Sequence, residues 1–494
     1  MTPDDNAEIR HDDGRVELRD PAALTASPLY NHDLAPVPVK DRRWNTWDYA
    51  ALWVSMAHCI PTYTLASTMI GEGLAWWQAL LAIAIGNLIV LVPILLNSHP
   101  GTKYGIPFPV FARAAYGTAG SNLPALMRAL VACGWFGINA WIGGAALQTF
   151  FTSLWPGWAG LLGIAHPGWS EHGFQNTQWI AFAIFWCINV LVIFRGMELL
   201  RRVERWAAPY VLVMTGLLVW WAISKAGGLG PILKNTSYTG TKPFWSVFIP
   251  SLTATIAFWS TLSLNMPDFT RFGRSQRDQA IGQVVALPTT MTVFAAMGIA
   301  ITSATALIYG KSIWDPIQLG GMFHNKAIVA IAMFTVVVAT LAVNIAANTV
   351  SPANDFANAF PKHVDFKRGG LITGVIGIAM QPWQLLANPV RYLNGWLGGY
   401  GAALGSIGGV LVVDYWIVRR GKLDLTALYT VQGAYRYKRG WHVPAVLATL
   451  IGFAVALLGA FWEPMHPIYD WSWFVAFGLS GGLYLTLAKS GMAA

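Results

Sequence analysis

Long apolar stretches separated by short polar segments fill most of this 494-residue chain. A helix needs about 20 apolar residues to cross the roughly 30 Å hydrocarbon layer of a bilayer, and the stretches approach or exceed that length. A membrane barrel would show short alternating segments instead. The pattern predicts an all-α integral membrane protein with twelve transmembrane helices, at 47–70, 75–97, 121–150, 178–195, 206–226, 244–266, 281–308, 327–352, 369–386, 393–418, 442–462 and 470–489.

Composition agrees with a chain whose main surroundings are the lipid bilayer. Only 11% of the residues are charged, and the mean hydropathy is +0.47. Residues 1–46 are polar and lack the apolar core of a signal peptide. We therefore expect them to form an N-terminal tail in the cytoplasm.

The positive charges indicate the orientation. Lys and Arg gather in the even-numbered loops, such as 267–280 and 419–441, whereas the odd-numbered loops 154–177 and 463–469 contain none. Because short cytoplasmic loops are enriched in Lys and Arg, both termini are expected in the cytoplasm, with the protein in the inner membrane of a bacterium. The net charge of +9 then reflects topology, and no nucleic-acid partner is expected.

The sequence offers little that points to metal, disulfide or nucleotide chemistry. Cys59, Cys133 and Cys187 lack metal-ligand spacing and are expected to be small buried residues. No phosphate-binding loop of the GxxxxGK type is present, which argues against ATP-driven pumping. A membrane enzyme would need a nucleophile, metal cluster or acid–base pair, and the sequence suggests none. A channel is the remaining alternative, which saturable uptake and exchange would separate from a carrier.

The first span carries polar residues at mid-membrane depth. His58 lies three residues before Pro61, and Ser55, Thr62 and Tyr63 flank them. Proline removes a backbone hydrogen bond and disturbs the preceding turn. A kink that only shapes packing is one interpretation. The histidine beside it favours an opened helix that lines a site.

The third and eighth spans each repeat polar groups at helical spacing. Trp135 and Asn139 are four residues apart and share a helix face, as do Asn344 and Asn348. An indole could stack on a planar ring while the amide binds the ring's edge. The alternative for Asn139 is a hydrogen bond that only joins helices, at a glycine-rich contact.

The sixth span has a hydroxyl-rich middle around Trp259. Trp259 is too deep for an ordinary interfacial belt. Asp268 is expected to end this helix in a solvated ion pair with Arg271.

The unusual spans are numbers one, three, six and eight, so two pairs lie five spans apart. This spacing predicts two inverted five-helix repeats of the LeuT-like kind, with the site between them near the membrane midplane. The repeats would cover residues 47–226 and 244–418, followed by two appended helices within 442–489.

Several motifs together resemble the nucleobase–cation symporter-1 family, whose members carry purines, cytosine, uracil, allantoin and hydantoins. The resemblance covers roughly residues 31–440. It rests on Asn31–Leu34, Pro100–Phe108 with Arg113, Cys133–Gly137, Asn265–Arg271, Asn344–Asn348 and Asp414–Arg420.

The resemblance implies roles for individual residues. Trp135 and Trp259 match two stacking tryptophans, Asn139 and Asn348 match polar groups that bind the substrate, and His58, Cys59 and Ile60 match the unwound first helix. Cys59 and Ile60 are therefore counted with the substrate site, and His58 is a candidate for proton transfer or gating. The expected substrate is a neutral, planar, amide-containing heterocycle such as a nucleobase, with allantoin or a hydantoin as the alternative.

One departure from the family concerns the coupling ion. Sodium-coupled members use hydroxyl side chains on the eighth helix and carbonyls of the first. Here the corresponding region is formed by Ser55, Ala339, Ala342 and Val343, and the two hydroxyl positions are Ala342 and Val343. Proton coupling is therefore favoured over sodium coupling, although a sodium-coupled symporter stays the alternative. A monomer without a cofactor is expected.

Overall fold

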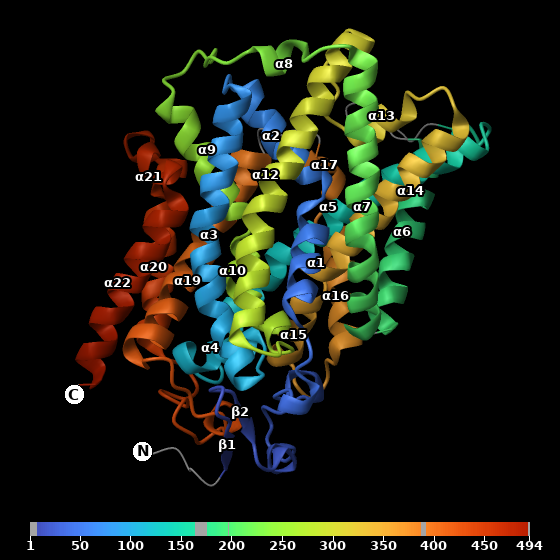
Figure 1. Cartoon of the computed structure of the whole chain (residues 1–494). Coiled ribbons are helices and arrows are strands. Elements are labelled where there is room, and N and C mark those ends of the chain that lie inside the picture. Colours follow the sequence, from blue (N-terminus) through green and yellow to red (C-terminus); the bar gives the residue numbers. More distant parts are fainter. Residues whose placement is uncertain (1–6, 164–174, 196, 387–391, 493–494) are drawn as a thin grey trace.

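Helices dominate the computed structural model, which describes residues 7–163, 175–195, 197–386 and 392–492. The long helices run side by side as one bundle, and a short two-stranded sheet lies at one end of it (Figure 1). The start of the chain at β1 and the far end of α22 lie toward that same end of the bundle. An even number of membrane crossings would give this arrangement.

The first half of the bundle comprises α1 to α7. Their bounds are α1 Thr46–Ala57, α2 Ile60–Gly71, α3 Trp76–Tyr104, α4 Phe108–Tyr116, α5 Asn122–Leu154, α6 Asn176–Arg195 and α7 Met197–Ala226. The short helix α8, Gly230–Lys234, lies in the connection to the second half.

The second half begins with a sixth span that is divided into short helices. The helices of the second half are α9 Trp245–Phe258, α10 Ser260–Asn265, α11 Pro267–Thr270, α12 Gln276–Tyr309, α13 Pro316–Gly321, α14 Lys326–Asn348, α15 Val350–Ala359, α16 Phe366–Ala379, α17 Pro382–Leu386 and α19 Gly398–Val412. Two π-helical turns flank α19, η5 Tyr392–Leu397 and η6 Val413–Val418. The chain closes with α20 Val443–Phe461, α21 His466–Asp470 and α22 Ser472–Met492.

The predicted spans agree with these helices to different degrees. Among the described residues, eight helices are long and apolar enough to cross a membrane, or nine if the bent pair Glu463–Asp470 and Ser472–Ala488 is one span. The other three predicted spans, 47–70, 244–266 and 369–386, fall on shorter or broken helices. The helical membrane fold is confirmed, whereas the count of twelve stays a prediction. The 154–177 loop and the connection after residue 386 lie partly outside the described residues.

The helices begin and approach one another for recognisable local reasons. The Asn45 side chain caps α1, and the Asp48 carboxylate accepts a hydrogen bond from the Asn45 backbone N–H, which completes a capping box. A Cβ at Gly137 of α5 would lie 2.3 Å from the Gly377 carbonyl of α16. Only glycine allows this close approach, which agrees with small residues at helix contacts in membranes.

Two spans are broken at the same depth in the bundle. The first span stops at Ala57 and resumes at Ile60, with Pro61 in the first turn of α2, where proline costs no hydrogen bond. The sixth span stops at Phe258 and resumes at Ser260, so Trp259 itself is the break. The expected opening of the first span is therefore confirmed, and the sixth span is also broken, without a proline or glycine at the break.

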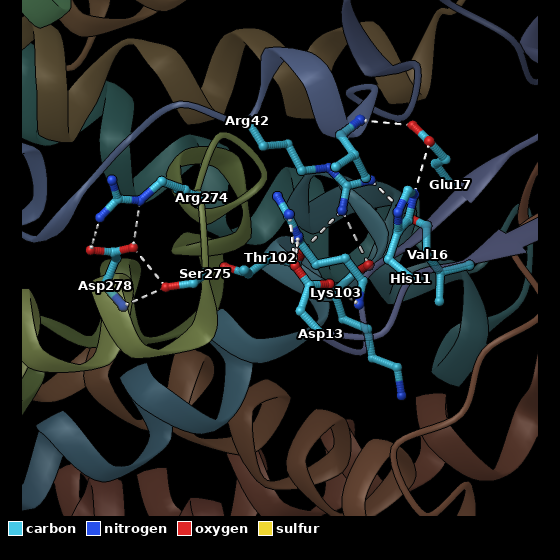
Figure 2. Close-up of polar contacts among 12 residues, drawn as sticks. His11, Asp13, Val16, Glu17, Arg42, Thr102, Lys103, Arg274, Ser275 and Asp278 are labelled. Atoms are coloured by element: carbon cyan, nitrogen blue, oxygen red, sulfur yellow. Dashed lines mark hydrogen bonds and ion pairs between the residues drawn. The ribbon is translucent and has the colours of Figure 1, made fainter.

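The segment before α1 packs against the bundle. Strands β1, Glu8–Arg10, and β2, Val16–Leu18, form an antiparallel pair. Arg42, which is 2% exposed, donates to the carbonyls of Val16 and Val37, and to Thr102 and Lys103 at the end of α3 (Figure 2). Residues 7–46 of the predicted tail are thus an ordered part of the fold.

Candidate functional site

A small cavity lies where the two broken spans meet the third and eighth. Trp135 and Asn139 come from α5, Trp259 from the break after α9, and Asn348 from the end of α14. The remaining lining residues are Met56, Cys59, Phe258, Thr261, Leu262, Val343 and Ala347. The structure therefore gathers five of the six residues predicted to bind the substrate, from segments far apart in the sequence.

The aromatic side chains of this cavity form a connected group. The ring of Phe258 lies 5.2 Å from Trp135 and 5.0 Å from Trp259, both edge to face. The ring centroid of Trp53 lies 5.1 Å from that of Trp259, again edge to face. The indole N–H of Trp135 donates to the Tyr400 hydroxyl at 3.2 Å. The two tryptophans are thus held by neighbours that orient their rings. Phe258 was not predicted from the sequence, although its position beside Trp259 could have indicated it.

Two polar atoms beside the cavity lack a hydrogen-bond partner among the described residues. The Nδ2 atom of Asn139 donates to the Trp135 carbonyl at 3.0 Å, but its Oδ1 is buried and unpartnered. The indole Nε1–H of Trp259 is also buried without an acceptor. A buried polar group without a partner costs free energy. The pair offers one acceptor and one donor to a ligand with amide groups.

Asn348 is part of a chain of amide side chains that joins two helices, α14 and α6. Its Nδ2 donates to Asn344 Oδ1 at 3.1 Å, and Asn344 Nδ2 donates to Asn189 Oδ1 of α6 at 3.1 Å. In this series of hydrogen bonds, the nitrogen of the Asn348 amide bonds within the protein. The expected shared face of Asn344 and Asn348 is confirmed.

The space between the tryptophans is small in this conformation. The cavity has a volume of about 30 Å³, room for roughly one or two water molecules. A planar heterocycle is larger than this space, so this conformation does not admit one between the tryptophans.

A larger cavity of about 360 Å³ adjoins the first. Cys59 belongs to both, whereas His58 and Ile60 line only the larger one, together with Tyr63 and Thr215. Its other walls are mainly apolar, and some of them, such as Trp220, are exposed on the outside of the bundle. The larger cavity is therefore a groove toward the lipid, and Ile60 lies apart from the tryptophans.

His58 is anchored by hydroxyl groups. Its Nε2 lies 2.7 Å from the Thr215 hydroxyl of α7 and 3.3 Å from the Tyr63 hydroxyl, and the ring packs edge to face against Phe294 at 4.6 Å. Its Nδ1 is buried without a partner among the described residues. Among the described residues, no carboxylate forms an ion pair with His58.

The region expected to hold a coupling ion has few side-chain oxygens. Ser55 of α1 is buried, and Ala339, Ala342 and Val343 are buried on α14, which packs against α1. The three α14 residues can offer only backbone carbonyls. Within helices, those carbonyls are already engaged in the backbone ladder.

Two expectations from the sequence are wrong. Asp268 is fully buried, not solvated: its Oδ1 accepts hydrogen bonds from the Phe108 N–H at 3.1 Å and the Asn354 amide at 3.0 Å. The N-terminal segment covers Arg271, which donates to the Asp33 carbonyl. Cys187 is exposed on α6, whereas Cys59 and Cys133 are buried as expected.

Comparison with known proteins identifies the family of the chain. The sequence pattern of the family described as permeases for cytosine/purines, uracil, thiamine and allantoin matches residues 36–478. The allantoin permease of Bacillus subtilis (strain 168) is 39% identical over 463 residues, 93% of each chain. The purine-uracil permease NCS1 of Arabidopsis thaliana is 40% identical over 468 residues, 92% of this chain and 77% of the relative.

Solved structures agree with this assignment. The closed conformation of Mhp1, a nucleobase-cation-symport-1 family transporter with bromovinylhydantoin bound, has a TM-score of 0.77 at 25% identity and covers 94% of this chain and 96% of Mhp1. The inward-facing conformation of Mhp1 has a TM-score of 0.73. The LeuT-like architecture is thereby confirmed, and the relatives are transporters and not enzymes. This chain belongs to the nucleobase–cation symport-1 family of membrane permeases.

Proposed function

We propose that this permease imports a neutral, planar, amide-containing heterocycle, with allantoin, uracil and purines as the first candidates. The observation that carries the proposal is the cavity at the two helix breaks, where Trp135 and Trp259 meet the amides of Asn139 and Asn348. Aromatic side chains stack on planar rings whatever atoms the ring contains. The amides distinguish one heterocycle from another by hydrogen bonding. The names of the relatives support the same class of substrate.

The unpartnered atoms in the site favour a ligand with both donors and acceptors. Asn139 Oδ1 would accept from a ring N–H, and the Trp259 indole would donate to a ring carbonyl. An amide in a ring presents these two groups side by side. A hydrocarbon ligand would leave both buried atoms unpaired.

Proton coupling completes the proposal. A coupling sodium ion in transporters of this architecture is held by unwound carbonyls and helix ends, and α14 adds no side-chain oxygen at Ala339, Ala342 or Val343. A coupling proton needs no such set of oxygen ligands. The basic loops support the cytoplasmic placement of both termini, with the protein in a bacterial inner membrane.

Uptake of a radiolabelled panel by transporter-deficient cells tests the proposal. The panel comprises uracil, cytosine, adenine, guanine, hypoxanthine, allantoin and hydantoins. We expect saturable uptake of at least one compound and its exchange against unlabelled compound. Absence of uptake for the whole panel by a well-expressed protein would overturn the assignment, and uptake without saturation would favour a channel.

A further inference from the structure

A second buried polar cluster lies beyond the substrate cavity, toward the end of the bundle where the N-terminal segment packs. It contains Arg128 of α5, Asp268 of α11 and Asp355 of α15, all with no exposed surface. The transport site described above uses none of these three groups. Charges in such a place are costly unless each is paired and hydrogen-bonded.

Asp355 is incompletely paired. Its Oδ2 lies 3.3 Å from Arg128 Nη1, and its Oδ1 has no hydrogen-bond partner among the described residues. The Nε of Arg128 is likewise unpartnered there. A fully buried carboxylate with one long contact is poorly stabilised, so a proton on Oδ1 would relieve much of the cost of burial.

Among the described residues, Arg128 is the positive group that acts on Asp355, whereas Arg271 acts on Asp268. Asp268 on α11 adds a like charge that acts on Asp355. Arg113 of α4 is engaged by the Asn358 side chain and the carbonyls of Leu29 and Leu428. The remaining neighbours from packed elements are the Cys133 thiol of α5 and Asp33 of the N-terminal segment, whose carboxylate accepts from the Phe366 N–H of α16. Lys367 and Arg368 of α16 lie at its exposed start.

Arg128 connects this cluster to the substrate site. Its Nη2 lies 3.4 Å from the carbonyl of Ala347, which lines the cavity beside Asn348. The eighth span breaks immediately afterwards, between α14 and α15 at Thr349. One guanidinium therefore contacts both the buried carboxylate and the backbone that positions the substrate-facing amide.

We propose that Asp355 is the proton carrier of this transporter and that Arg128 couples its protonation to the substrate site. A proton binds at Oδ1 and neutralises the carboxylate, which weakens its ion pair with Arg128. The freed guanidinium strengthens its contact with Ala347 and so alters the position of Asn348. Release of the proton on the other side of the membrane restores the ion pair. The inference rests on the proposed proton-coupled transport.

Proteoliposomes made with the purified full chain test the proposal, with labelled allantoin and uracil as probes. For one proton per substrate, a gradient of one pH unit supports about tenfold accumulation. We expect Asp355→Asn to lose this accumulation and its pH dependence, while exchange without a gradient persists. Asp355→Glu should restore accumulation with a shifted pH midpoint. Asp278→Asn, which changes an aspartate paired with Arg274 far from the cavity, should accumulate as wild type.

Three results would overturn the proposal. One is proton-driven accumulation by Asp355→Asn equal to wild type. Another is loss of coupling in His58→Gln but not in Asp355→Asn, which would assign the proton to the first helix. If Asp355→Asn does not fold, Asp355→Glu decides, because an unchanged pH midpoint would exclude this carboxylate. Failure of the proposed function is distinguishable, since wild type itself would then neither accumulate nor exchange either probe.

Discussion

The amide nitrogen of Asn348 donates to Asn344 Oδ1 at 3.1 Å, which commits one of its two N–H groups within the protein, and Asn348 also lines the cavity. Asn139 shows the same arrangement, with its nitrogen on the Trp135 carbonyl. Both amides thus present acceptors, which suit the N–H groups of an amide ring.

Removing either acceptor should weaken binding without unfolding the protein. In Asn139→Ala or Asn348→Ala, a ligand N–H is left unpaired, at a cost of about 1–3 kcal/mol, or roughly 5- to 150-fold in affinity. Substrate quenching of tryptophan fluorescence in detergent measures the affinity. Both variants should elute as monodisperse species. Wild-type affinity in both would contradict the roles of these amides.

Lengthening the third-span amide should alter the choice of substrate. In Asn139→Gln, the acceptor moves by one methylene, so the ranking of uracil, purines and allantoin should change more than the best affinity. Competition by the panel against the best wild-type substrate gives the ranking. An unchanged ranking would mean that Asn139 only joins helices.

Transport should depend on protons and not on sodium. We expect uptake to be unchanged when choline replaces sodium, faster at acidic external pH, and abolished by a protonophore. The physical reason is the lack of side-chain oxygens at Ala342 and Val343. Strong stimulation of substrate binding by sodium would show that backbone carbonyls and water complete an ion site.

Acid should loosen the N-terminal segment through Glu17. Burial alone would raise its pKa, but hydrogen bonds from the Val39 N–H and His11 outweigh burial and hold the pKa below its ordinary value (Figure 2). A carboxyl with a lowered pKa stabilises the folded state above its unfolded pKa, and this contribution is lost as the pH falls through the folded pKa.

Hydrogen exchange of residues 8–42 measures this effect. Protection factors, which correct for the intrinsic pH dependence of exchange, should fall on acidification through the pKa of Glu17, and Glu17→Gln should show lower protection already at neutral pH. Asp41→Asn is a matched control, because its carboxylate is half exposed and lies 3.9 Å from Arg43, its ion-pair partner among the described residues. Equal exchange in Glu17→Gln and wild type would show that Glu17 does not hold the segment.

The sequence predicted the helical fold and most of the cavity because both follow from spacing along single helices. Trp135 and Asn139 share a face at any tertiary arrangement, and Pro61 marks the first break. Burial of Asp268 could not be predicted in this way, since it depends on α4 and α15 packing around a helix end. The contacts of Arg128 with both Ala347 and Asp355 could not be predicted from the sequence either, because these two residues lie on separate helices across a break.

Binding of labelled allantoin and uracil to purified wild-type, Trp135→Ala and Trp259→Ala proteins tests the central claim most directly. Trp220→Ala is the matched control, because this tryptophan is 69% exposed on α7. Stacking contributes about 1–3 kcal/mol per ring, so each cavity variant should lose on the order of 5- to 150-fold in affinity or bind undetectably, whereas the control binds as wild type. Wild-type affinity in both cavity variants would contradict the placement of the substrate between these two tryptophans.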